Sequence, residues 1–172
     1  NKMGANIKLR AKKIYNGEKI ANIHVESKEG LKGINCSSKL NSSAIDEFLI
    51  IFLVAAKAKG VSVFKELGEM NKKESKRLDL GIKFLKKIGI KVVRFKDDIK
   101  IYGNPNLELS KNYEMKNFLK DHRIFFLSCI TALTLGGKWK INDKKSANTS
   151  FPEFLKILQN VGGQIKWEKG KI

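Results

Sequence analysis

The sequence predicts an α+β domain made of repeated βαβαββ units, with buried helices inside and sheets outside. Three observations lead to this fold class. Segments of strand and helix type follow one another twice in the same order, the first helix of each copy is apolar on nearly every side, and the second is apolar on one face only. The 172 residues suffice for one domain with its own core, so we assign residues 1–172 to a single domain.

The first unit begins at Leu31 and ends at Tyr102. In order, we expect a strand at 31–36, a helix at 46–59, a strand at 61–66, a helix at 72–88 and strands at 90–95 and 99–102. The stretch 48–56 is apolar all round, which is typical of a helix inside a domain. The second helix is amphipathic, because its apolar residues fall on one stripe, made of Leu78, Ile82, Leu85 and Ile88.

A second copy of this order follows. We expect a strand at 107–110, a helix at 123–135, a strand at 138–142, a helix at 151–161 and a last strand at 164–168. Asp46 and His122 stand at the starts of the two first helices and lie 76 residues apart, and Val63 and Trp139 in the next strands have the same separation. Such a period indicates two copies of one structural unit.

Glycines end the second helix of both copies. Gly89 and Gly162 each follow a helix and precede a strand, as expected for a left-handed turn at a helix C-terminus. Residues 2–8 look like the same helix exit without its helix. We therefore expect a helix upstream and the tail of a third unit, which would make the chain part of a longer protein.

The net charge of +18 suits a nucleic-acid partner. The lysines are spread along almost every segment, however, and only four arginines occur, so we expect no specific nucleic-acid binding. No apolar stretch reaches the roughly 18 residues of a membrane span, and no charged-then-apolar leader opens the chain. We therefore expect no membrane partner. Cys36 and Cys129 stand alone without metal-ligand spacing, so we expect no metal site and a cytoplasmic protein with reduced thiols.

Three short clusters lie at or near predicted helix starts. They are Lys-Glu-Ser-Lys-Arg at 73–77, Asp-His-Arg at 121–123 and Ser-Phe-Pro at 150–152. They place acids, a histidine and cations where free backbone N–H groups can hold an anion, so we expect them to converge at one end of the domain.

A structural alternative stays open for the same residues. Capping boxes are formed by Ser43 with Asp46, by Asn71 with Glu74 and by Ser150 with Glu153. In that interpretation the carboxylates only accept backbone hydrogen bonds. A lone histidine such as His122 is also commonly a structural group.

The clusters resemble the C-terminal domain of the EPSP synthase family, whose members join phosphoenolpyruvate to shikimate 3-phosphate. That family carries M-G-A, D-E-[FY]-P, E-L-R-V-K-E-S-D-R, D-H-R and K-[ST]-F-P in this order. The matching segments here are residues 3–5, 46–49, 69–77, 121–123 and 149–152. The resemblance implies an enolpyruvyltransferase fold of two domains, each of three βαβαββ units, with the active site between them.

The resemblance also implies the acid–base groups. Asp46 would handle the proton of the attacking shikimate hydroxyl, Glu74 would exchange a proton with the methylene carbon of phosphoenolpyruvate, and His122 would stand beside them as a third catalytic residue. Addition to an enol ether needs an acid at one carbon and a base at the nucleophile. The resemblance calls for no cofactor.

The substrate contacts follow from the same comparison of motifs. Arg77 and Arg123 would hold the carboxylate and phosphate of phosphoenolpyruvate, where fixed cations are needed. Lys73 would contact the hydroxyl side of shikimate 3-phosphate, and Asp46 and Glu69 would complete the substrate-binding set.

The chain departs from the family motifs at Leu49, Asn71, Lys76, Phe125 and Thr149. Thr149 replaces a family lysine, so one cation is missing unless Lys144 or Lys145 reaches the site. The N-terminal half that grips shikimate 3-phosphate is outside this chain, so we expect the chain alone to be inactive. Three hypotheses remain: the C-terminal part of a working EPSP synthase, a diverged anion-binding member without turnover, and a basic nucleic-acid-binding module.

Overall fold

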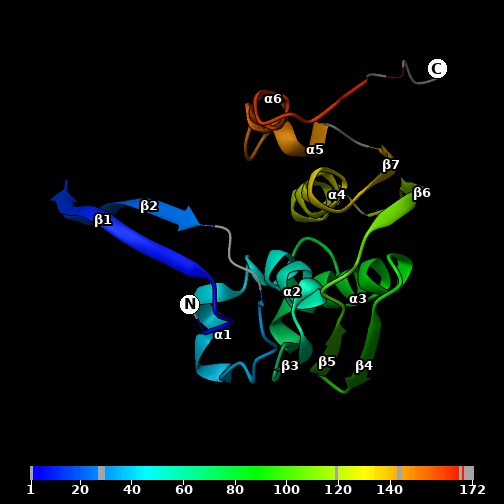
Figure 1. The fold of residues 1–172 in the computed structure, drawn as a ribbon, viewed down its shortest axis with the longest axis horizontal. Helices are drawn as coiled ribbons and strands as arrows, with labels where there is room; N and C mark the ends of the chain where they lie inside the picture. The colour runs from blue at the N-terminus through cyan, green and yellow to red at the C-terminus, as the bar shows by residue number, and fades with distance from the viewer. Residues whose placement is uncertain (1, 27–29, 119, 143–144, 167, 169–172) are drawn as a thin grey trace.

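The computed structural model describes residues 2–26, 30–118, 120–142, 145–166 and 168, and Figure 1 shows their arrangement. The strands are β1 (Asn6–Tyr15), β2 (Glu18–Glu26), β3 (Gly60–Phe64), β4 (Lys91–Phe95), β5 (Asp98–Gly103), β6 (Leu109–Met115) and β7 (Gly136–Ile141). The helices are α1 (Asn41–Ala44), α2 (Phe48–Lys57), α3 (Arg77–Lys87), α4 (His122–Leu135), α5 (Lys145–Asn148) and α6 (Phe154–Asn160). Two 3-10 turns complete the set, η1 (Ser38–Leu40) and η2 (Gly68–Lys72).

The first unit has the predicted order of elements. β5 lies between β3 and β4 and pairs antiparallel with both. The predicted strand at 31–36 runs alongside β3 and makes isolated parallel bridges, from Lys32 to Lys59 and from Asn35 to Val63. Ile99 and Ile101 of β5 are buried, and α2 packs on this strand. The unit is therefore a small sheet covered by helices.

The core lies between the inner helices. α2 packs against both α3 and α4, as the apolar pattern of α2 and α4 predicts. Gly81 of α3 allows this close approach, because a Cβ there would meet Leu49 Cδ2 at 2.8 Å. Phe52 and Phe64 join α2 to the sheet with ring centroids 5.1 Å apart. Among the helices in the described ranges, none has the length and apolarity of a membrane span.

The second unit repeats the first part of the first unit, with different boundaries. β6 and β7 pair in parallel, and α4 connects them. The strand expected at 107–110 begins at Leu109 and extends to Met115, because its pairing with β7 continues to Ile141. The strand expected at 164–168 is wrong for the part that the structure describes, since residues 164–166 and 168 carry no strand. Trp167 lies outside the described residues.

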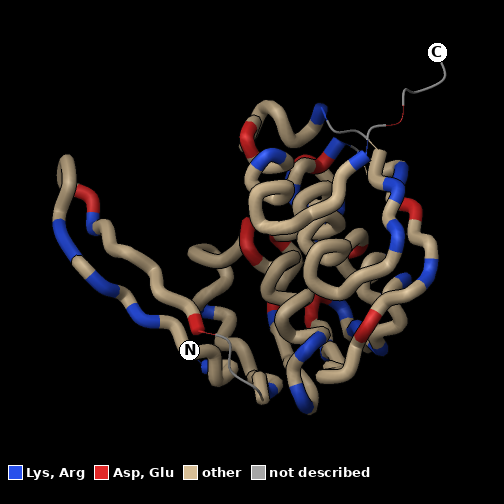
Figure 2. Tube along the Cα trace, turned by 45° about the horizontal axis from the view of Figure 1, so that its top comes forward, with Lys and Arg blue, Asp and Glu red and all other residues tan. Residues whose placement is uncertain are grey.

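β1 and β2 form a hairpin in the segment where we expect the tail of a third unit. Its strands pair antiparallel, with an irregularity between Arg10 and Lys13. Both views show it extending away from the helices (Figures 1 and 2). Leu9 and Ile23 face each other across the hairpin and are exposed by 53% and 69%, whereas the matching hairpin of β4 and β5 is covered by helices.

Of the three predicted helix caps, those at Ser43 and Ser150 are wrong, and Asn71 caps its helix across a loop. α2 begins at Phe48, and the Ser43 hydroxyl donates to the Leu40 carbonyl instead of capping it. α6 begins at Phe154 and not at residue 151, and it has no side-chain cap, so Ser150 does not cap it. α3 begins at Arg77 and not at residue 72.

Asn71 still caps α3, from a position before the loop. Its side-chain oxygen accepts the backbone N–H groups of Leu78 and Asp79 at 3.0 and 3.3 Å. Residues 73–76 therefore form a loop that precedes the helix. Lys73 and Glu74 are freed from helical geometry, so their side chains can turn towards neighbouring segments.

The two cysteines give a test of the core. Burial raises the pKa of the Cys129 thiol to about 12, whereas Cys36 is half-exposed. We expect Cys36 to react with Ellman's reagent at pH 8, and Cys129 to react at least about 100-fold more slowly, through opening of the fold. The Cys36→Ser variant should lose the fast phase, and two fast thiols would contradict the burial of α4.

Candidate active site

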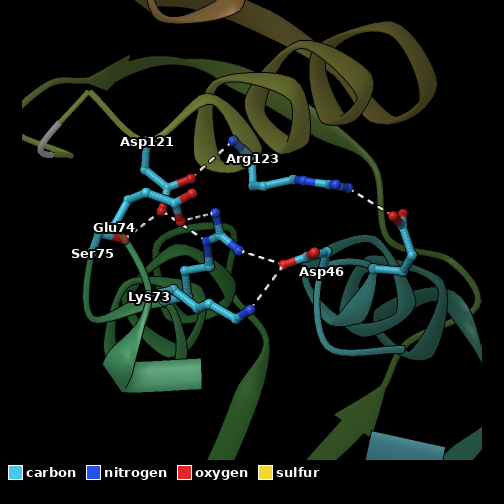
Figure 3. Close-up of polar contacts among 8 residues, drawn as sticks. Asp46, Lys73, Glu74, Ser75, Asp121 and Arg123 are labelled. Atoms are coloured by element: carbon cyan, nitrogen blue, oxygen red, sulfur yellow. Dashed lines mark hydrogen bonds and ion pairs between the residues drawn. The ribbon is translucent and has the colours of Figure 1, made fainter. Parts of the chain in front are cut away.

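Three segments meet at the ends of the inner helices. They are the turn before α2, the loop between η2 and α3, and the start of α4 (Figure 3). Their polar side chains form what we call the ion-pair cluster, which consists of Asp46, Glu47, Lys73, Glu74, Ser75, Arg77, Asp121 and Arg123. The expected convergence of the first two sequence clusters is therefore confirmed.

Arg77 is the centre of the cluster. Its side chain is only 2% exposed, and it contacts three carboxylates. Nε donates to Asp121 Oδ2 at 2.9 Å, Nη1 donates to Asp46 Oδ1 at 2.8 Å, and Nη2 donates to Glu74. Burial alone lowers its pKa, but the hydrogen bond to Asp121 and the three negative charges outweigh that effect and raise the pKa. Arg77 is thus a buried, permanently charged group.

Asp121 joins two of the segments from inside. Its carboxylate is fully buried and accepts the Ser75 hydroxyl at 2.6 Å as well as Arg77 Nε. Its other oxygen accepts the backbone N–H of Arg123 at 2.9 Å, which caps α4. One side chain therefore fixes the loop before α3 to the start of α4.

Asp46 stands at the solvent side of Arg77. Lys73 Nζ lies 3.7 Å from its Oδ1. Burial raises the pKa of Asp46, but the charges of Lys73, Arg123 and Arg77 and the hydrogen bond from Arg77 outweigh this and lower it. Because the pKa in the folded state is below the unfolded value, these contacts stabilise the fold above about pH 4, and their contribution is lost as the pH falls through the folded value.

Arg123 is the second arginine of the site. Its Nη1 donates to Glu47 Oε1 at 2.7 Å. Its Nε is buried and has no hydrogen-bond partner among the described residues. A buried, unsatisfied donor on a cation is favourable for an incoming anion. The neighbouring His122 packs its ring edge-to-face on Phe126, with centroids 5.8 Å apart.

The site is not basic, although the chain is. Its cations are Lys73, Arg77 and Arg123, and its carboxylates are Asp46, Glu47, Glu74 and Asp121. Four negative charges thus meet three positive ones, whereas lysines and arginines are scattered over the hairpin and the body (Figure 2). Carboxylates of the chain, not a free anion, face Arg77 at the start of α3. An anionic substrate therefore needs further cations from outside these segments.

The third sequence cluster lies near the second and does not join the ion-pair cluster. Phe151 packs on Phe126 with centroids 6.4 Å apart. The Thr149 hydroxyl donates to the Ser146 carbonyl at 3.4 Å. Lys145 is the first residue of α5, and Lys144 lies outside the described residues.

Two of the proposed site residues make their contacts with groups other than the arginines in the part of the chain that the structure describes. Glu69 is an exposed residue of η2, and its Oε1 accepts Lys72 Nζ at 2.7 Å. His122 has the ring contact described above. The roles proposed for both stay predictions.

Sequence reasoning missed Glu47 and Asp121 as partners of the two arginines. A signal for the first pair was present, because Glu47 and Arg123 are 76 residues apart and so occupy equivalent positions in the two units. Equivalent residues at the starts of two inner helices can touch where those helix starts lie side by side. The opposite charges at the starts of two inner helices therefore indicated this contact.

Comparison with known proteins shows similarity to one family, the family that the sequence motifs resemble. The family model for EPSP synthase (3-phosphoshikimate 1-carboxyvinyltransferase) matches residues 1–158. The 3-phosphoshikimate 1-carboxyvinyltransferase of Thermodesulfovibrio yellowstonii is 34% identical over 157 residues, which are 91% of this chain and 36% of that protein. The protein of the same name from Ruthia magnifica is 34% identical over 167 residues, which are 95% of this chain and 37% of that protein.

Solved structures show the same likeness. A 2.37 Å structure of EPSP synthase from Acinetobacter baumannii superimposes with a TM-score of 0.77 at 31% identity, covering 94% of this chain and 37% of that one. The enolpyruvyl transferase NikO of Streptomyces tendae superimposes with a TM-score of 0.61 at 13% identity, covering 95% of this chain and 34% of that one, and supports the fold alone. The chain thus spans little more than a third of the length of these proteins.

Proposed function

The chain belongs to the EPSP synthase family, and we propose that it forms the C-terminal part of a 3-phosphoshikimate 1-carboxyvinyltransferase. Such an enzyme transfers the carboxyvinyl group of phosphoenolpyruvate to shikimate 3-phosphate, a step of aromatic amino-acid biosynthesis. The observation that carries the proposal is that Arg77 holds two partly exposed carboxylates, Asp46 and Glu74, on one side of the ion-pair cluster. A pair of carboxyl groups around one fixed cation suits chemistry that both adds and removes a proton.

In the addition step, the shikimate hydroxyl oxygen forms a bond to the central carbon of phosphoenolpyruvate. We assign the proton of that hydroxyl to Asp46, while Glu74 protonates the methylene carbon to give a methyl group. In the elimination step, Glu74 takes a proton back from that methyl group as the bond to phosphate breaks. Lys73, 3.7 Å from Asp46, favours the ionised form that a base requires.

The phosphoenolpyruvate anion would lie against Arg123, whose buried Nε lacks a partner among the described residues. Arg77 is occupied by carboxylates, so it orients these groups and adds positive potential at the anion site. We propose that His122 and Glu69 border the substrate. The excess of carboxylates in the cluster supports the expectation that this chain alone does not turn over. The remaining cations would come from an N-terminal half like those of the longer relatives.

We extend the proposal to a cytoplasmic enzyme that needs no cofactor. The two cysteines, Cys36 and Cys129, are free, which agrees with a reducing compartment. A diverged, non-catalytic member of the family is the second candidate. The observation that favours it is Thr149, which stands where the family motif has a lysine.

Reconstitution distinguishes the two candidates. The chain is fused to, or expressed with, the N-terminal part of the Thermodesulfovibrio yellowstonii relative, and phosphate release is measured with both substrates. Release that depends on shikimate 3-phosphate and is absent from each part alone would support catalysis. A fused protein that binds phosphoenolpyruvate without releasing phosphate would support the non-catalytic candidate.

Replacing Thr149 with lysine should raise the rate of the reconstituted enzyme. A restored cation–phosphate contact is worth about 1.4 kcal/mol, so we expect about a tenfold increase in kcat/KM. Thr134→Lys is the matched control, because it makes the same change on an exposed part of α4 and should alter the rate less than about twofold. An equal effect of both variants would assign the gain to general charge.

A further inference from the structure

We propose that Asp121 is a positioning residue for the acid–base pair, whose buried carboxylate orients Arg77 and thereby sets where Asp46 and Glu74 lie. The inference deepens the proposed function and rests on it for the naming of the acid–base pair. The orientation of Arg77 itself can be measured without any activity.

Burial separates the three carboxylates around Arg77 into two kinds. The side chain of Asp121 is 0% exposed, whereas those of Asp46 and Glu74 are 45% and 58% exposed. Substrate can therefore reach the last two but not Asp121. Any effect of Asp121 on the reaction must pass through the groups that it touches.

Those contacts use both of its oxygens. Oδ2 accepts Arg77 Nε at 2.9 Å and the Ser75 hydroxyl at 2.6 Å, and Oδ1 accepts the Arg123 backbone N–H at 2.9 Å. A carboxylate held at three points is fixed in place. The buried environment also strengthens its attraction for the guanidinium, since little water screens the pair.

The planar guanidinium of Arg77 links the position of Asp121 to the positions of Asp46 and Glu74. With Nε held by Asp121, the planar guanidinium presents its two terminal nitrogens away from Asp121, and they donate to Asp46 and Glu74. These two carboxylates come from separate segments, the turn before α2 and the loop before α3 (Figure 3). Without Asp121, the Arg77 guanidinium is free to turn and to donate a second hydrogen bond to Asp46 or to Glu74.

A purely structural role for Asp121 is the competing explanation, because it also caps α4. Asparagine and serine cap helices about as well as aspartate. Asp121→Asn and Asp121→Ser therefore keep a cap on α4 but remove the charge that faces Arg77. These variants separate capping from positioning.

The test uses NMR on the 172-residue chain itself. In the unaltered chain, the Arg77 Nε–H signal should be resolved and should exchange slowly with water, and its absence would overturn the proposal whatever the variants do. In Asp121→Asn, we expect this exchange to be at least about tenfold faster, while the Arg123 amide stays protected. The pKa of Asp46 should fall further, because the charge of Arg77 is then shared with fewer carboxylates.

Asp97→Asn is the matched control, because it removes one negative charge from an exposed side chain that pairs with Arg94. It should leave the Arg77 signal and the pKa of Asp46 unchanged. An Arg77 signal that stays protected in both Asp121 variants would show that Asp121 only caps α4. If Asp121→Asn does not fold, Asp121→Ser and the measurement on the unaltered chain decide the question.

Activity then tests the link to catalysis. In the reconstituted enzyme, Asp121→Asn should lower kcat by about tenfold or more with a smaller change in KM, because binding groups stay in place. A positive NMR result together with a reconstituted enzyme that never turns over would refute the proposed function and leave the positioning of Arg77 intact. Normal kcat after loss of the Arg77 signal would refute the positioning role.

Discussion

Replacing Arg77 with methionine should lower the free energy of unfolding by about 3–5 kcal/mol, the largest loss expected for any single site change in the cluster. The Arg77 side chain is 2% exposed, and its guanidinium is the charge partner of Asp121, which is itself fully buried. Methionine fills much of the volume but leaves that carboxylate with only hydroxyl and amide donors. Urea unfolding followed by circular dichroism measures the change.

The double variant Arg77→Met with Asp121→Asn shows where this loss comes from. If it arises from an orphaned buried charge, the double variant should be more stable than the sum of the single losses predicts, by about 0.5–3 kcal/mol. Arg94→Met is the control, because Arg94 pairs with Asp79 and Asp97 at the surface with 35% of its side chain exposed. It should cost less than about 1 kcal/mol. Equal losses at Arg77 and Arg94 would show that Arg77 is not buried in solution.

The order of elements could be predicted because it depends on local patterns. An apolar stretch such as that of α2, an amphipathic one such as α3, and a glycine such as Gly89 each carry their own signal. The start of α3 could not be predicted, because its cap, Asn71, acts across a loop. Asn71 lies seven residues before the first amide it accepts, and no local spacing rule contains that contact.

The site was predictable as a set of residues and not as an arrangement. The motifs brought Asp46, Glu74, Arg77 and Arg123 to attention, and the repeat placed them near helix ends. The saturation of Arg77 by carboxylates depends on contacts between residues 31 and 44 positions apart, which only the packing of α2, α3 and α4 creates. Net charge was a poor guide for the same reason, since +18 spread over the surface coexists with an excess of carboxylates in the cluster.

Replacing Glu74 with glutamine should lower kcat of the reconstituted enzyme by about 10²–10⁴-fold, the usual contribution of a general acid–base group. Glutamine keeps the size of the side chain and a carbonyl oxygen that can accept from Arg77, but it cannot give or take the proton. The carboxylate is 58% exposed, so the fold should lose less than about 1 kcal/mol. Phosphate release under saturating substrates measures the rate, and circular dichroism confirms the fold.

Two further variants show whether the effect is specific to Glu74. Glu108→Gln, at an exposed site outside the cluster, is the matched control and should change kcat by less than about twofold. Glu69→Gln tests the predicted substrate contact, which would raise KM and leave kcat unchanged, because uniform binding affects only that constant. A Glu74→Gln enzyme that keeps its rate would remove Glu74 from the chemistry and leave Asp46 as the one carboxylate beside Arg77 able to move the proton.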